Sequence, residues 1–173
     1  AMRQLLLLRH AKSSWDDPAL ADFERPLAPR GRQAAPLIGR EMAERGWLPD
    51  FALVSAAVRT RQTWELVSGQ WPAGTSAAAF TEAIYEAAPR DILGEIRQVS
   101  ADVRCLLVVG HNPGLEMLAR DLAGPGTDPA ALERLKAKFP TAALARFEVA
   151  TGWPELCAGS ARLSDFIRPR DLG

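Results

Sequence analysis

The chain has 173 residues, of which 47% are hydrophobic and 24% charged, a composition that suits one globular domain with a substantial core. Lysine plus arginine and aspartate plus glutamate both number 21, so no global field favours nucleic acid or an anionic membrane. The apolar runs are too short to span a bilayer or to act as a signal peptide, and two cysteines make no disulfide framework. We therefore expect a cytoplasmic protein with a single domain over residues 2–173, and we exclude Ala1, which precedes Met2, as a remnant of cloning.

The hydrophobic periodicity predicts strands and helices that largely alternate. In chain order these are a strand (4–9), a helix (32–45), a strand (51–55), a helix (57–67), a short strand (77–80), a helix (89–99), a strand (105–109), helices (113–122 and 130–138) and two strands (143–149 and 162–168). The last two strands show partial period-two alternation and could lie toward an edge of the sheet. The alternation predicts a layered α/β domain with a mostly parallel sheet.

The segment 12–31 is predicted to lack regular structure, because prolines and a glycine punctuate it. These residues are Pro18, Pro26, Pro29 and Gly31. Pro36 lies early in the helix predicted over 32–45, so either the first turn bends or the helix begins later than residue 32.

Polar residues follow two of the predicted strands at the point where each strand ends. Arg9 and His10 come directly after the apolar run 5–8, and the run 105–109 ends in Gly110-His111-Asn112-Pro113-Gly114. The chain has two histidines, one at each strand end. The carboxyl ends of parallel strands form the functional edge of such sheets. A neutral imidazole there can attack phosphorus, and a guanidinium can hold phosphate oxygens with two parallel hydrogen bonds.

The residues around His111 are also typical of a helix N-terminus. Asn112 is a good N-cap and Pro113 a good first helical residue, so free backbone amides would favour an anion nearby. The alternative is a simple strand-to-helix turn. A third strand end is followed by Arg59 in the first turn of a helix, whereas Arg61 is expected on the solvated surface. Two arginines and two histidines thus converge on one edge, and phosphoryl transfer needs little else.

Several motifs occur in an order that closely resembles the histidine phosphatase superfamily, which includes the phosphoglycerate mutases. They are Leu8-Arg9-His10-Ala11-Lys12-Ser13-Ser14-Trp15, Arg25-Pro26-Leu27 with Arg30-Gly31, Arg59-Thr60-Arg61-Gln62-Thr63 and Val109-Gly110-His111-Asn112-Pro113-Gly114. Two further segments, Lys138-Phe139-Pro140-Thr141 and Phe166-Ile167-Arg168-Pro169, resemble its SixA-type phosphohistidine phosphatase branch. The resemblance covers nearly the whole chain and implies a phosphoglycerate mutase-like, three-layer α/β/α sandwich.

The resemblance also implies roles for individual residues. His10 matches the histidine that accepts the phosphoryl group as a covalent phosphohistidine, and Arg9 and Arg59 match the arginines that hold the phosphate. His111 matches the second pocket histidine, which stabilises the transferring group by hydrogen bonding and charge. Ser13 stands where many members use a hydroxyl to touch the phosphate.

The general acid is the least determined position. The mutases carry a glutamate after the third strand, and Glu82 lies at a similar place, with Glu86 as a less favoured substitute. The alternative is that Glu82 is a solvated loop carboxylate. An imidazole leaving group, unlike an alkoxide, would need no strong acid. Asp16 falls where mutases often have asparagine, and an ionised carboxylate there would repel phosphate.

Together these residues predict a metal-independent phosphatase that works by two in-line displacements through His10, without a cofactor. His10 must be neutral at the attacking nitrogen, with the other ring nitrogen held by a carbonyl. The preferred substrate is protein phosphohistidine, carried by a phosphotransfer protein as partner, and the sequence does not fix an oligomeric state. The alternatives are a phosphatase or mutase of small phosphate esters or phosphosugars and, more remotely, a non-catalytic phosphate-binding module.

Overall fold

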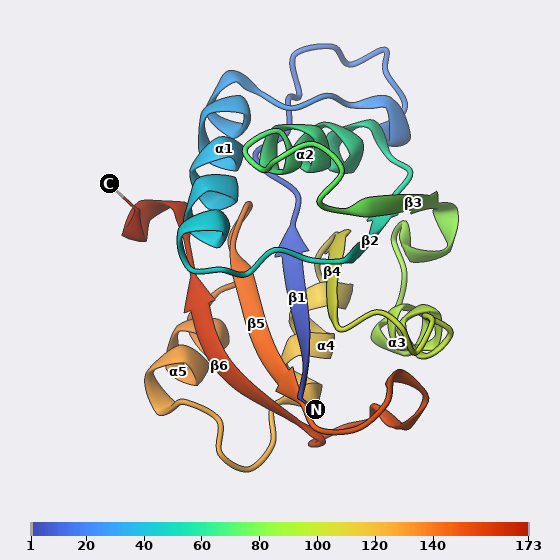
Figure 1. The fold of residues 1–173 in the computed structure, drawn as a ribbon. Helices are drawn as coiled ribbons and strands as arrows, with labels where there is room; N and C mark the ends of the chain where they lie inside the picture. Colours follow the sequence, from blue (N-terminus) through green and yellow to red (C-terminus); the bar gives the residue numbers. More distant parts are fainter. Residues whose placement is uncertain (1, 173) are drawn as a thin grey trace.

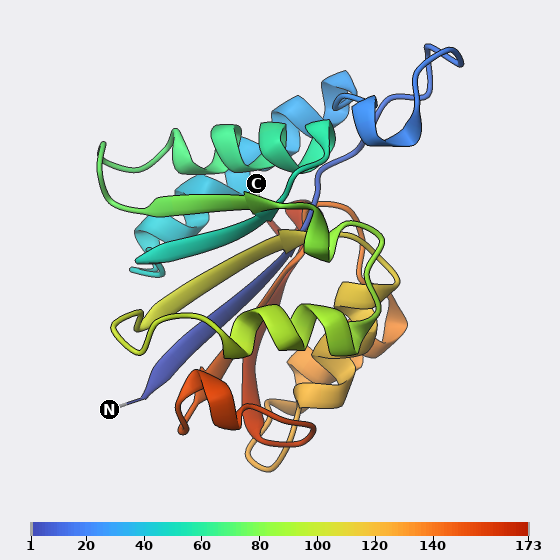
Figure 2. The same ribbon diagram turned by 90° about the vertical axis from the view of Figure 1, so that its right-hand side faces the viewer.

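The computed structural model describes residues 2–172 and contains a six-stranded mixed sheet between two layers of helices (Figures 1 and 2). The strands are β1 (Arg3–Arg9), β2 (Phe51–Ser55), β3 (Ala77–Thr81), β4 (Cys105–Gly110), β5 (Leu144–Val149) and β6 (Ala161–Ile167). The α-helices are α1 (Pro29–Glu44), α2 (Val58–Ser68), α3 (Pro89–Arg97), α4 (Gly114–Leu122) and α5 (Pro129–Ala137). Short 3₁₀ helices are η1 (Asp22–Glu24), η2 (Glu82–Ile84), η3 (Trp153–Glu155) and η4 (Pro169–Asp171).

The sheet order is β3-β2-β4-β1-β5-β6. The four strands from β3 to β1 are parallel, whereas β5 and β6 pair antiparallel. The prediction of a mostly parallel sheet is therefore confirmed, and so is the position of the last two strands toward an edge. Because β1 and β4 are neighbours in register, Arg9 lies opposite Gly110. His10 and His111 thus leave the sheet side by side.

The leucine run of β1 alternates between the two faces of the sheet. All four leucines are fully buried: Leu5 and Leu7 pack in one cluster with residues of α3, α4 and α5, whereas Leu6 and Leu8 pack in a second cluster with residues of α1 and α2. Figure 2 shows the same division, with α1 and α2 on one face and the other three helices on the opposite face. Full burial of each leucine contributes about 1.5–3 kcal/mol, so β1 is anchored from both sides.

The first helix begins earlier than predicted. It starts at Pro29 rather than residue 32, and Pro36 lies in its interior. Pro29 occupies the first helical position, where a missing N–H costs nothing. Gly31 is required because the helix start approaches Lys12 closely: a Cβ at this position would lie 2.2 Å from the Lys12 carbonyl oxygen. The same segment contains η1, where no regular structure was predicted.

Two further observations concern residues 2–172. No helix there is long and apolar enough to cross a bilayer. Within the same range, no three His, Cys, Asp or Glu side chains are grouped so that they would hold a metal ion.

Candidate active site

The carboxyl ends of β1, β2 and β4 surround a cavity of about 250 Å³. Eleven of its twelve lining residues are polar or charged, which distinguishes it from an apolar ligand pocket. The lining residues are Arg9, His10, Lys12, Ser13, Trp15, Asp22, Arg25, Arg59, Glu86, His111, Asn112 and Thr141.

His10 is held in one tautomer by the backbone. Its Nδ1 lies 2.7 Å from the carbonyl oxygen of Ala11, and because a carbonyl only accepts, Nδ1 carries the proton and donates it. The side chain is 7% exposed, and burial, reinforced by the charges of His111 and Arg59, lowers the pKa of His10 to about 3. His10 is therefore neutral near pH 7, with an unprotonated Nε2 that is chemically able to act as a nucleophile.

His111 is held by a serine and an arginine. Its Nδ1 accepts from Nη2 of Arg59 at 3.3 Å, because a guanidinium has no acceptor, so Nε2 carries the proton and donates to Oγ of Ser55 at 2.7 Å. Burial, followed by the charge of Arg59, lowers the pKa of His111 to about 4. The rings of His10 and His111 lie 5.4 Å apart. The structure therefore brings the two histidines together in their neutral forms.

Arg9 and Arg59 enter the cavity from β1 and from the first turn of α2. Nη1 of Arg9 donates to the carbonyl oxygen of Phe139 at 3.0 Å. Thr63 joins the two elements, because its Oγ1 donates to the Arg59 carbonyl at 2.7 Å and accepts from the Ala11 amide at 3.0 Å. The Nε atoms of both arginines are buried without a hydrogen-bond partner in the part of the chain that the structure describes. Unpaired buried donors are costly unless a ligand satisfies them, and a phosphate oxygen is a suitable acceptor.

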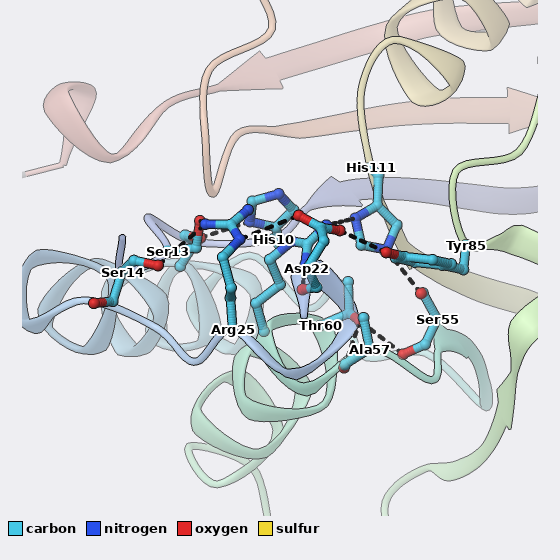
Figure 3. A network of polar contacts seen from close by, with 12 residues as sticks. His10, Ser13, Ser14, Asp22, Arg25, Ser55, Ala57, Thr60, Tyr85 and His111 are labelled. Atoms are coloured by element: carbon cyan, nitrogen blue, oxygen red, sulfur yellow. Dashed lines mark hydrogen bonds and ion pairs between the residues drawn. The ribbon is translucent and has the colours of Figure 1, made fainter. Parts of the chain in front are cut away.

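Asp22 binds two of the three arginines that line the cavity (Figure 3). Its carboxylate accepts from Nη2 of Arg59 at 3.0 Å, from Nε of Arg25 at 3.1 Å and from the Tyr85 hydroxyl at 2.5 Å. Burial alone would raise the pKa of Asp22, but the hydrogen bonds from Tyr85 and Arg59 outweigh it and lower the pKa to about 2. Asp22 is therefore ionised at neutral pH and has no proton to give to a leaving group. Arg25 also donates to Oγ of Ser13 at 2.9 Å.

Five of the predicted site residues line the cavity together: Arg9, His10, Ser13, Arg59 and His111. The sixth, Glu82, does not. It begins η2, is exposed and lies outside the lining residues, whereas Glu86 is among them. Glu86 has φ of +50°, a left-handed conformation that is uncommon for glutamate and often found near functional sites. Of the two glutamates, the structure thus places Glu86, and not Glu82, in the lining of the cavity.

Two other expectations concern neighbouring residues. Asp16 is exposed and lies outside the cavity lining, so its carboxylate does not face the phosphate pocket. The prediction that Asn112 caps a helix is wrong: α4 begins at Gly114, and the Asn112 side-chain amide instead donates to the Phe139 carbonyl at 2.9 Å. The backbone of this segment turns before the helix starts, so its N-cap position falls at Pro113.

The residues that sequence reasoning missed are Asp22, Arg25, Ser55 and Tyr85. Arg25 belongs to the Arg25-Pro26-Leu27 motif, but the sequence assigns it no function. Ser55 is the last residue of a predicted strand. Asp22 and Tyr85 follow no periodic pattern, and their contact spans 63 positions of the chain. A tertiary contact of this kind has no local sequence signal.

Comparison with known proteins agrees with this geometry. The sequence model of the histidine phosphatase superfamily (branch 1) matches residues 5–88. The uncharacterized protein Rv1276c of Mycobacterium tuberculosis is 42% identical over 170 residues, which cover 94% of this chain and all of the relative. A protein of Agrobacterium tumefaciens assigned as the phosphohistidine phosphatase SixA has a TM-score of 0.81 at 30% identity, with coverage of 96% and 98%. A protein of Nakamurella multipartita with the same assignment has a TM-score of 0.85 at 28% identity, with coverage of 98% and 97%.

The chain belongs to the histidine phosphatase superfamily, and it is a phosphatase. The fold is the α/β fold of the phosphoglycerate mutase-like proteins. Within the superfamily, the two solved structures place it in the SixA-type branch.

Proposed function

We propose that the chain hydrolyses protein phosphohistidine through a covalent phosphohistidine on His10. The observation that carries the proposal is a neutral His10 with Nδ1 fixed on the Ala11 carbonyl, in a cavity that also contains Arg9, Arg59 and His111. Nε2 of His10 attacks phosphorus and the leaving group departs. Water then attacks the phosphorylated His10 and releases inorganic phosphate.

The guanidinium groups of Arg9 and Arg59 stabilise the negative charge on the equatorial phosphoryl oxygens. His111 is neutral before substrate binds, so it brings no charge of its own at that stage. A phosphate dianion beside the ring raises the pKa of His111, and the protonated ring then donates to a phosphoryl oxygen. Ser13 is positioned by Arg25 and offers a hydroxyl to the same group.

The carboxyl groups that line the cavity favour phosphohistidine over a phosphate ester as the substrate, because the two leaving groups differ in their need for an acid. Of the two carboxyl groups that line the cavity, Asp22 is ionised and Glu86 is exposed at the rim, so no buried acid is available to protonate an alkoxide. A phosphohistidine ring that carries a proton on its other nitrogen departs as neutral imidazole, a much weaker base than an alkoxide, so it needs no acid from the enzyme. Trp15, which is 71% exposed beside the cavity, gives the site an open rim that a protein surface can reach.

A substrate panel tests this choice. It compares a phosphorylated histidine-containing phosphotransfer domain, a sugar phosphate and p-nitrophenyl phosphate, with wild type, Glu86→Gln and the matched exposed variant Glu82→Gln. We expect the phosphotransfer domain to give the highest kcat/KM, with little effect of either substitution.

A second candidate function, hydrolysis of small phosphate esters, is favoured by the position of Glu86 in the cavity lining. In that case the sugar phosphate would be the best substrate, and Glu86→Gln alone would abolish its hydrolysis. That result would contradict the phosphohistidine proposal.

A further inference from the structure

A second depression, separate from the phosphate cavity, lies between the start of α1, the end of α5 and η4. We call it the basic groove. It has a volume of about 390 Å³, and six of the eleven residues that line it are cationic, while none of the eleven is acidic. The cationic residues are Lys12, Arg30, Arg134, Lys138, Arg168 and Arg170. Since the whole chain carries equal numbers of acidic and basic residues, this grouping is local and not a consequence of excess charge.

The basic groove adjoins the phosphate cavity. Lys12 and Thr141 line both depressions, so a molecule bound in the basic groove lies next to the phosphate cavity. The close approach of Gly31 to the Lys12 backbone fixes this arrangement, and the Ala28 amide donates to the Lys12 carbonyl at 2.8 Å. The start of α1, with Arg30, is thereby held against the segment that leaves His10.

Most of these cations are not neutralised by the protein itself. Among residues 2–172, Arg168 pairs with Asp171 at 2.8 Å, and Arg134 donates to the Phe166 carbonyl at 3.0 Å. The other four cationic residues of the basic groove form no ion pair with the described part of the chain, and all four are exposed. Exposed like charges gathered in one depression create a positive potential that attracts an anionic partner.

The groove also contains apolar surface. Ala34, Ala137, Pro140 and Pro169 contribute to its lining, between the cationic groups. A bare phosphate ion makes no use of such surface and is far smaller than the groove. An acidic protein segment with apolar side chains matches both the charge and the apolar lining.

We propose that the basic groove binds an acidic, partly apolar segment of the phosphoprotein whose phosphohistidine enters the neighbouring cavity. This inference rests on the proposed function and adds to it the surface that recognises the substrate protein. It predicts that substrate selection depends on cations that do not touch the transferred phosphoryl group.

The test reverses three charges that line the groove but not the phosphate cavity, in the variant Arg30→Glu/Lys138→Glu/Arg170→Glu. The matched control, Arg32→Glu/Lys136→Glu/Arg120→Glu, changes net charge equally at exposed positions outside the groove. Circular dichroism and thermal unfolding establish that both variants fold. The substrates are a phosphorylated histidine-containing phosphotransfer domain and p-nitrophenyl phosphate.

We expect the groove variant to lose at least about tenfold in kcat/KM on the phosphotransfer domain, mainly through KM, and less than about twofold on p-nitrophenyl phosphate. The control variant should retain both activities. Wild-type kcat/KM on the domain should also fall more steeply with added salt than that of the groove variant.

Two results would overturn the inference: unchanged activity of the groove variant on the phosphotransfer domain, or an equal loss on both substrates. The second would mean that the groove cations act on the phosphate cavity itself. Failure of the wild type to hydrolyse the phosphotransfer domain, with p-nitrophenyl phosphate still turned over, would instead contradict the proposed function.

Discussion

The two buried histidines should make the stability of the protein strongly pH-dependent. The ordinary pKa of histidine is 6.5, and the folded state lowers that of His10 to about 3 and that of His111 to about 4. Between the folded and unfolded pKa values of each histidine, the unfolded chain binds a proton that the folded state does not. The free energy of unfolding therefore falls as the pH falls below about 6.5. The slope is half of about 1.4 kcal/mol per pH unit at about pH 6.5 and approaches the full value below it, so a change from about pH 6.5 to about pH 4.5 costs about 2 kcal/mol for each histidine that stays neutral.

Urea unfolding of wild type, His10→Gln and His111→Gln at these two pH values measures the effect. Each variant should lose about 2 kcal/mol less than the wild type between the two conditions, because it lacks one titrating group. Asp22 does not contribute in this range, since its stabilisation, present above its ordinary pKa of 3.8, is lost only as the pH falls toward about 2.

A direct reading of the two imidazoles comes from NMR, because the chain has only two histidines. Both ring signals should remain those of the neutral form at about pH 5.5, a full unit below the ordinary pKa. Signals that titrate near 6.5, or variants that lose as much stability as the wild type, would refute the reasoning.

Three further predictions follow from single contacts. Arg59→Met should lower kcat/KM by about 10²–10³. The control Arg61→Met changes an exposed residue on the same helix, and its kcat/KM should stay within about twofold of the wild-type value. Equal losses in the two variants would contradict a phosphate-binding role for Arg59. Asp22→Asn removes an ionised carboxylate from the cavity, so inhibition by inorganic phosphate should strengthen roughly fivefold, and weaker inhibition would show that Asp22 serves mainly to position Arg59. Gly31→Ala should destabilise the fold by more than about 2 kcal/mol in thermal unfolding, because its Cβ would meet the Lys12 backbone. The control Gly94→Ala, which has open space around its Cβ, should stabilise the protein by up to about 1 kcal/mol. Similar changes in stability for the two variants would be inconsistent with the close approach at Gly31.

The sheet and its functional edge could be predicted because buried parallel strands read as uninterrupted apolar runs. The runs 5–8 and 105–109 identified the two central strands and hence the meeting of His10 with His111. The start of α1 was misplaced because Pro29 and Gly31 look like helix breakers in isolation. In the structure Pro29 occupies the first helical position, which proline favours, whereas the close backbone contact that Gly31 permits has no local sequence signal.

The residues of the candidate site also fall into those that the sequence predicts and those that only the folded structure reveals. Residues that directly follow strands were found, because strand ends determine where they lie. Asp22 and Tyr85 come from irregular segments, and only the folded chain brings them to Arg59. Glu82 and Glu86 are four positions apart beyond the same strand. Which of them faces the cavity depends on a 3₁₀ turn and on the positive φ of Glu86, and neither was predicted.

The most direct test of the phosphatase mechanism is to trap the phosphorylated enzyme. The wild type is mixed with a phosphorylated histidine-containing phosphotransfer domain, quenched at alkaline pH within the first turnover and analysed by mass spectrometry of its peptides. We predict one acid-labile phosphoryl group on His10, none on His111, and no phosphoenzyme or phosphate release with His10→Ala. Phosphate release at the wild-type rate by His10→Ala, or a phosphoryl group trapped at another residue, would contradict the assignment of His10 as the nucleophile.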